Sequence, residues 1–262
     1  MNDWYNTSGK QLSSIDWLIL HHKAKFEERK AFIKKHIKDS DKKILDLGCG
    51  PALWLELIDS VANNDCELIG VDIDINTLKY AQNKASSWNR KITFINCDIE
   101  KDIENLEKVD VILVFNMFSY IKKPEVFLTK LYNLLNPGGR IIIRQYDGGT
   151  LRIGPMAEEL RITIDNSLLA SLSNSKEFHH YDMDRVYKIV QDSTIPNKEF
   201  YLELYQKVSP YTITVEQYIE ENMQWIKNYV SDYAKEKISN WLDTQFKKYS
   251  YFIEVDLVAI LS

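Results

Sequence analysis

The sequence predicts an α/β fold in which helices cover both faces of a mostly parallel sheet. Apolar stretches suited to buried strands recur about every 20 to 30 residues, with helical patterns between them. Several of these stretches are apolar throughout, as expected for parallel strands that are covered on both faces. A tight turn with two glycines follows the first of them and leads into a helix. These observations indicate a doubly wound sheet.

The chain begins with a polar segment that precedes a helix. Apolar residues recur at helical spacing from about Ser14 to Ile33, with a break expected near His21 and His22. The opposite face is basic and includes Lys25 and Arg29. We interpret that face as solvated, with a surface for a phosphate or an acidic partner as the alternative.

The segment that follows alternates strands with helices. Strands are expected where the chain is apolar and rich in β-branched residues, at 43–47, 67–71, 92–96, 109–115 and 140–144. Helices are expected at 53–62, 76–85 and 124–135. The last of these begins with Pro124 and is expected to stop at the turn 136–139.

The second half of the chain changes character after the turn 147–149. Helices are expected at 155–172 and 182–191, and strands at 200–208 and 252–261. Thr214 and Gln217 have the spacing of a capping box, so a long helix is expected to start there, with 239–246 extending or following it. We predict one domain of 262 residues. It would consist of an N-terminal helical segment (1–40), a core (41–147), a helical cap (148–195) and C-terminal sheet-edge strands with a long helix (196–262).

Composition and charge exclude several classes of protein. Hydrophobic residues make up 45% and charged residues 27% of the chain, which is ordinary for a globular protein. The net charge of −5 provides no field that would attract nucleic acid or anionic lipid. The three cysteines lack metal-ligand spacing. The first residues lack the basic and apolar regions of a signal peptide, and no apolar run approaches the length of a membrane span. We expect a cytoplasmic protein with free thiols, no metal and no membrane partner.

Acidic residues follow three successive predicted strands. Asp46, Asp72 and Asp98 would lie together at the carboxyl ends of the sheet, where open α/β folds bind ligands. A carboxylate in the position of Asp72 can accept both hydroxyls of a ribose, and one at Asp98 an adenine amino group. Asp46 lies beside Gly48 and Gly50, where it would repel a pyrophosphate but suit an ammonium or sulfonium group. This disfavours a dinucleotide cofactor.

These motifs resemble those of class I, Rossmann-like, S-adenosylmethionine-dependent methyltransferases. The stretch 46–51 resembles the Asp-x-Gly-x-Gly loop that holds the methionine part of the cofactor, and 134–140 resembles the turn into the fifth strand. The resemblance covers about residues 43–145. It implies that the cofactor is S-adenosyl-L-methionine, with S-adenosyl-L-homocysteine as product, and that it contacts the following residues: Asp46, Gly48, Cys49, Gly50, Asp72, Ile73, Asp98, Ile99 and Asn116. For Asp98 a helix N-cap is the alternative role, and for Asn116 a strand-end cap.

The resemblance also implies the remainder of the sheet. Family members carry seven strands, of which the last two form an antiparallel hairpin at one edge. The strands expected at 200–208 and 252–261 would supply it. Cap elements commonly precede the first strand and follow the fifth, as 1–40 and 150–180 would here.

Catalytic and substrate-binding residues are less clearly marked. A general base for the acceptor could come from His179, His180, Tyr181 or Tyr146, although an exposed or structural role is the alternative for each. Aromatic side chains could close over the sulfonium, and an arginine near the site would suit an acidic substrate. The candidates for substrate contact are Tyr5, Trp17, Phe118, Tyr120, Arg144 and Arg152.

Several methyl acceptors are disfavoured. The segment after the fourth strand, 116–119, departs from the Asn/Asp-Pro-Pro-Tyr/Phe pattern of enzymes that methylate base amino groups, and no Pro-Cys dipeptide occurs. We therefore expect methylation of nitrogen or oxygen in a small molecule or short peptide held in an enclosed pocket. The alternatives are a non-catalytic methyltransferase-like binding or regulatory subunit, and a tRNA, rRNA or protein methyltransferase.

Overall fold

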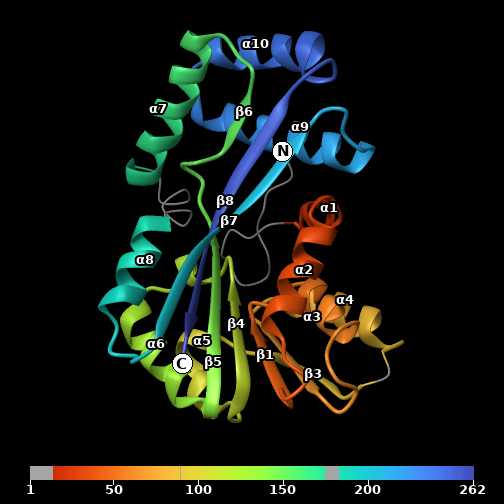
Figure 1. Cartoon of the computed structure of the whole chain (residues 1–262), viewed down its shortest axis with the longest axis vertical. Coiled ribbons are helices and arrows are strands. Elements are labelled where there is room, and N and C mark those ends of the chain that lie inside the picture. Colours follow the sequence, from red (N-terminus) through yellow and green to blue (C-terminus); the bar gives the residue numbers. More distant parts are fainter. Residues whose placement is uncertain (1–13, 89, 175–182) are drawn as a thin grey trace. The chain divides into compact units, whose positions relative to one another are not determined.

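The computed structural model describes residues 14–88, 90–174 and 183–262, and its contacts divide the chain into two compact units (Figure 1). The first unit runs to Gln145 and includes Val186–Tyr201 and Val258–Ser262. The second consists of Tyr146–Arg185 and Leu202–Leu257.

The first unit contains five parallel strands in the order β3-β2-β1-β4-β5. Their bounds are β1 Lys43–Leu47, β2 Glu67–Asp72, β3 Ile92–Asn96, β4 Val109–Phe115 and β5 Leu135–Tyr146. Strand order reverses between β1 and β4. Doubly wound folds bind ligands beside such a reversal, at the carboxyl ends of the strands. The predicted α/β fold is confirmed.

Within the described residues the sheet has eight strands, whereas seven were predicted. From β5 the order continues to β8 (Tyr251–Leu261) and β6 (Arg152–Gly154), and β7 (Lys198–Val208) pairs with β8. Strand β6 runs antiparallel to β8. Three residues are too few to show the alternation that marks a strand in a sequence, which is why β6 escaped prediction.

Helices cover both faces of the first unit's sheet, as Figure 1 shows for α3 and α4 on one side and α6 on the other. The helices are α1 Ile15–Ala24, α2 Phe26–His36, α3 Leu53–Asp59, α4 Ile75–Ala85, α5 Ile99–Asp102, α6 Pro124–Asn133 and α8 Met183–Asp192, with 3-10 turns η1 Ile103–Asn105 and η2 Phe118–Tyr120. Ile44 of β1, Leu68 of β2 and Val111 of β4 share one core cluster with apolar residues of α2, α3 and α4.

The structure corrects several local predictions for the first unit. The N-terminal helix breaks at Lys25 rather than at His21 and His22. The basic face of this helix is not wholly solvated, because Lys25 and Arg29 are buried. The turn 136–139 belongs to β5, where the register against β4 shifts.

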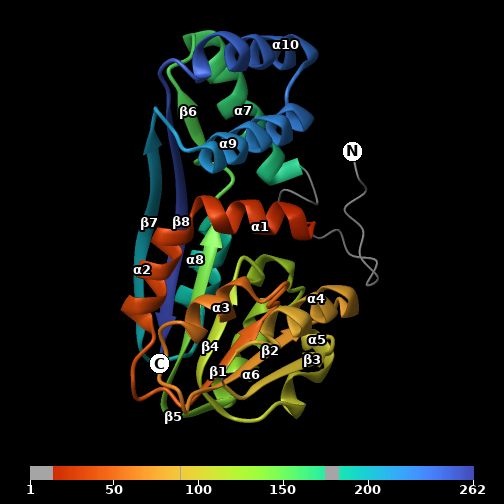
Figure 2. The same ribbon diagram turned by 90° about the vertical axis from the view of Figure 1, so that its right-hand side faces the viewer.

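In the second unit, helices α7, α9 and α10 lie together (Figure 2). They are α7 Glu158–Asn174, α9 Ile213–Ile226 and α10 Asp232–Trp241, with η4 Lys227–Tyr229 after α9 and a π-helical turn, η5 Leu242–Phe246, after α10. Helix α9 is capped by Thr212, whose side chain accepts from the Val215 amide, so the capping box predicted at Thr214 is wrong. Buried Tyr218 of α9 donates a 2.5 Å hydrogen bond to Glu254 of β8.

Among the described residues, no helix combines the length and the apolar character that crossing a membrane requires. The cysteines Cys49, Cys66 and Cys97 are free thiols.

Candidate functional site

The turn after β1 is held in a conformation that favours glycine. Gly48 and Gly50 have φ values of +68° and +52°, a region that side chains with a Cβ rarely enter. A Cβ on Gly48 would lie 2.7 Å from Cγ of Met117, whereas the space beside Gly50 is open apart from Leu18 Cδ1 at 3.8 Å. The loop is fixed to β2 because the amides of Gly48 and Cys49 both donate to the Val71 carbonyl, at 2.8 and 3.0 Å.

Asp46 is a buried carboxylate at the end of β1. Its side chain is 2% exposed, and its Oδ2 has no hydrogen-bond partner among the described residues. Burial, and secondly the charge of Asp72, raise the pKa of Asp46 well above its usual value. A ligand that brings a positive charge to this carboxylate would compensate both effects. The Cys49 thiol beside it is also buried, and its raised pKa keeps it neutral.

Asp72, at the end of β2, accepts one backbone hydrogen bond on each carboxylate oxygen. The Gly50 amide donates to Oδ2 and the Asp74 amide to Oδ1, both at 2.9 Å. A carboxylate has about four lone-pair sites, so this one retains acceptor capacity for the two hydroxyls of a ribose. Asp72 therefore links the glycine loop to the start of α4.

Asn96 was not singled out from the sequence but helps to build the site. Its amide nitrogen donates to the carbonyls of Asp72 and Ile73, at 3.0 and 2.9 Å. This contact holds the end of β2 against the end of β3, and the Cys97 amide adds a bond to the Asp72 carbonyl. An asparagine as the last residue of a predicted strand is a weak signal, because the same residue type is common in turns.

Asp98 lies at the N-cap of α5. It accepts from the Glu100 amide at 3.2 Å and forms an ion pair with Lys101 at 3.0 Å. Asp98 is therefore a helix N-cap, the role given above as the alternative to contact with adenine. Ile99, the first residue of α5, is half-buried beside it.

The segment after β4 faces the glycine loop through Met117. Asn116 has a positive φ of +52°, and its amide donates to the Arg144 carbonyl of β5 at 2.8 Å. Phe118 is fully buried, and Tyr120 is partly exposed.

The remaining candidates are dispersed. Trp17 is half-buried on α1, with its ring 5.9 Å from that of His21. Tyr146 and exposed Arg152 belong to the second unit, where the Arg152 side chain lies 3.4 Å from the Tyr251 hydroxyl. The predicted residues Tyr5, His179, His180 and Tyr181 lie outside the described residues.

Buried Arg144 lies on β5 in the first unit, beside two aromatic rings. Its guanidinium carbon is 5.1 Å from the Phe32 ring centroid and 5.3 Å from that of Trp54. Trp54 stands in the first turn of α3, directly after the glycine loop.

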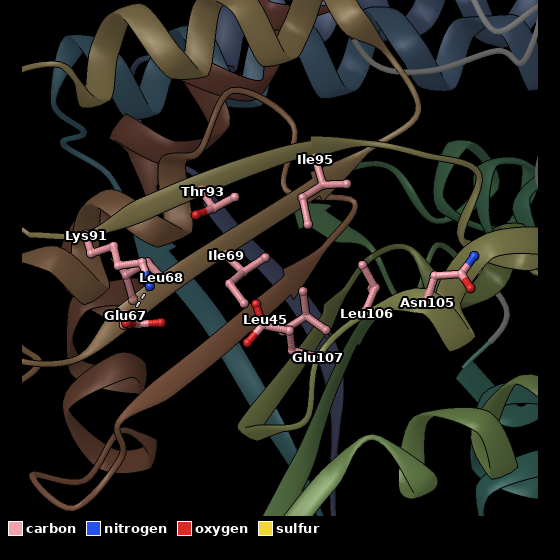
Figure 3. A pocket seen from close by; sticks show the side chains of 10 residues that line it. All are labelled: Leu45, Glu67, Leu68, Ile69, Lys91, Thr93, Ile95, Asn105, Leu106 and Glu107. Carbon is pink, nitrogen blue, oxygen red and sulfur yellow. Dashed lines mark hydrogen bonds and ion pairs between the residues drawn. The ribbon is translucent and has the colours of Figure 1, made fainter.

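A pocket on the first unit is separate from this site (Figure 3). Leu45, Ile69 and Ile95 lie along its floor, and the Glu67–Lys91 ion pair lies at its rim. Its lining residues come from β1 and β2 and from the segments 91–95 and 105–107, and they include none of Asp46, Asp72 and Asp98. In the part of the chain that the structure describes, no group of three or more His, Cys, Asp or Glu side chains is placed to hold a metal ion.

Comparison with known proteins agrees with this geometry. A family model described as a methyltransferase domain matches residues 38–248. The ubiquinone biosynthesis O-methyltransferase of Coxiella burnetii is 26% identical over 139 residues, which are 53% of this chain and 55% of that protein. The enzyme of the same name from Vibrio atlanticus is 30% identical over 101 residues, covering 38% of this chain and 41% of its own. The first of these matches spans about half the length of the relative, and the second less.

A similar solved structure is phosphoethanolamine N-methyltransferase 2 of Haemonchus contortus in complex with S-adenosyl-L-methionine. It has a TM-score of 0.55 at 15% sequence identity, over 94% of this chain and 56% of that one. At this identity the likeness concerns the fold alone. The family match extends over most of the chain, and the chain therefore belongs to the methyltransferase domain family, in its class I, S-adenosylmethionine-dependent group.

Proposed function

We propose that this protein is an S-adenosylmethionine-dependent methyltransferase that methylates a nitrogen or oxygen atom of a small molecule or short peptide. The observation that carries the proposal is the Asp46 carboxylate, which is buried, lacks a partner at Oδ2 among the described residues and lies beside the left-handed glycine loop. A buried carboxylate in this state is costly unless a cation accompanies it. S-adenosylmethionine carries two cationic groups, the sulfonium and the ammonium.

The residues of the first unit have distinct roles in this proposal. Gly48 and Gly50 let the ligand approach the backbone, and Asp46 compensates its positive charge. Asp72 accepts the ribose hydroxyls while its bonds to Gly50 and Asp74 keep the loop in place. Asn116 shapes the neighbouring edge of the site.

When bound, the cofactor supplies a methyl group made electrophilic by the sulfonium. The protein's contribution is to hold the acceptor atom in line with that methyl group and to exclude water. This division explains why the cofactor site is well marked in the sequence and the acceptor site is not. The names of the curated relatives support oxygen as the acceptor atom.

Isothermal titration calorimetry with S-adenosylhomocysteine, and with NAD in parallel, tests the proposed cofactor. We expect micromolar binding of S-adenosylhomocysteine and none of NAD. Binding of NAD alone would overturn the assignment. Turnover of S-adenosylmethionine with a panel of phenols, amines and short peptides then tests catalysis. Tight cofactor binding without turnover, together with a co-purifying protein, would instead indicate a regulatory subunit.

A further inference from the structure

Three buried cationic side chains lie close enough to His21 to lower its pKa, and we refer to Lys25, Arg29 and Arg144 as the cationic cluster. They are only 2%, 5% and 5% exposed. The guanidinium carbons of Arg29 and Arg144 lie 4.7 and 5.3 Å from the ring centroid of Trp54. Two guanidinium groups are thus held against one indole ring, and cation–π contact favours both positions.

The position of the cluster relates it to the cofactor loop. Trp54 belongs to the first turn of α3, which the loop leads into. Arg144 pairs in register with Phe115, the last residue of β4. Leu18, on the same helix as His21 and His22, lies beside Gly50. Arg29 and Arg144 therefore lie beside the carboxyl ends of the strands, next to the residues that would hold the methyl donor.

His21 and His22 lie in the same region, and His22 offers a further hydrogen-bond donor. The Arg29 guanidinium donates to Nδ1 of His22 at 3.2 Å, so the proton of the neutral ring is on Nε2. That Nε2 is buried and has no hydrogen-bond partner among the described residues. Burial lowers the pKa of His22 to about 3, with Arg29 and Lys84 contributing. Burial likewise lowers the pKa of His21, and Lys25, Arg29 and Arg144 all act in the same direction. The surroundings of His21 are therefore positively charged.

We propose that the methyl acceptor carries an anionic oxygen group, a carboxylate or a phosphate, which Arg29 and Arg144 bind near Trp54. A guanidinium has five N–H donors in a planar fork, so each arginine can bind an oxyanion alongside its neighbours in the protein. His22 orients Arg29. This inference rests on the proposed function, because it names the acceptor class of the same site.

The test uses the full chain saturated with S-adenosylhomocysteine and three small probes. Benzoate and its neutral isostere benzamide separate charge from shape, and inorganic phosphate separates the two anion types. Calorimetric titrations are made on the wild type, Arg144→Gln, Arg29→Gln and the control Lys108→Gln, which removes one exposed charge elsewhere on the first unit. We expect benzoate or phosphate to bind at least tenfold more tightly than benzamide. Each arginine variant should weaken that binding at least tenfold, and the lysine variant should leave it unchanged.

The outcomes separate the two proposals. Equal binding of benzoate, phosphate and benzamide, or no binding of any of them, would overturn the inference while leaving the cofactor assignment intact. Loss of S-adenosylhomocysteine binding in the wild type would instead overturn the proposed function. Stronger binding of phosphate indicates a phosphorylated acceptor, and stronger binding of benzoate a carboxylated one. If one arginine variant does not fold, the inference is still tested by the other arginine variant and by the comparison of benzoate with benzamide on the wild type.

Discussion

Replacing Asp72 by alanine is expected to weaken cofactor binding much more than it weakens the fold. The carboxylate holds the amides of Gly50 and Asp74 at 2.9 Å and is the proposed acceptor for the ribose hydroxyls. Hydrogen bonds to a charged group contribute about 1.5–3 kcal/mol each, so loss of the ribose contact should raise the Kd for S-adenosylhomocysteine about 10- to 150-fold. Loss of the two backbone bonds is partly offset, because the charge of Asp72 also acts on buried Asp46.

The same sheet offers a matched control at its opposite end. Asp110 accepts from the amides of Lys42 and Lys43 at 2.8 and 2.9 Å and from the Asn136 side chain at 2.8 Å. Asp110→Ala therefore removes the same kind of bonds far from the cofactor loop. It should lower Tm in differential scanning fluorimetry without changing the Kd.

Calorimetry of both variants decides the matter, with circular dichroism to verify folding. A Kd for Asp72→Ala within about twofold of the wild type corresponds to less than about 0.4 kcal/mol, and it would refute the role given to Asp72. An equal loss of affinity in Asp110→Ala would show that the effect reflects stability rather than the ribose contact.

Three further substitutions test other parts of the structure. Gly48→Val should lower Tm and abolish S-adenosylhomocysteine binding, because the valine Cβ would meet Met117 and the cofactor. Adding Met117→Ala to this variant should recover part of the Tm but not the binding. Recovered binding would contradict the role given to the glycine loop. Asp46→Asn should stabilise the ligand-free protein by about 1–3 kcal/mol near pH 8 and much less near pH 5, because the raised pKa of Asp46 makes the wild type lose stability as pH rises. Cofactor affinity should fall in the same variant, and an unchanged Kd would remove Asp46 from the site. Burial lowers the pKa of His36 from 6.5 to about 4, so the wild type should lose stability as pH falls across that range. In His36→Gln, the urea midpoint of unfolding should depend less on pH. Its value at neutral pH should fall, because the 2.6 Å contact with Tyr201 is lost.

Local patterns in the sequence were sufficient to predict the five parallel strands and the turn that follows the first of them. The five parallel strands, the glycine turn and the acidic residues at the strand ends all lie in short, regularly spaced segments. Because the carboxyl ends of parallel strands necessarily meet at one edge of a sheet, strand spacing is enough to place Asp46 and Asp72 together. The family resemblance rests on the same segments.

Only the tertiary structure shows which polar side chains are buried and which residues join neighbouring strand ends. Arg29 of α2 is buried with its guanidinium against Trp54 of α3, which is distant in sequence. Without that contact, the basic face of the helix looks solvated. Two further features also follow from how neighbouring strand ends pack. Oδ2 of Asp46 has no hydrogen-bond partner among the described residues, and Asn96 joins the ends of β2 and β3. Periodicity reports which residues of one segment share a face. Which other segment covers that face is set by contacts between residues far apart in the chain, and these appear only in the folded structure.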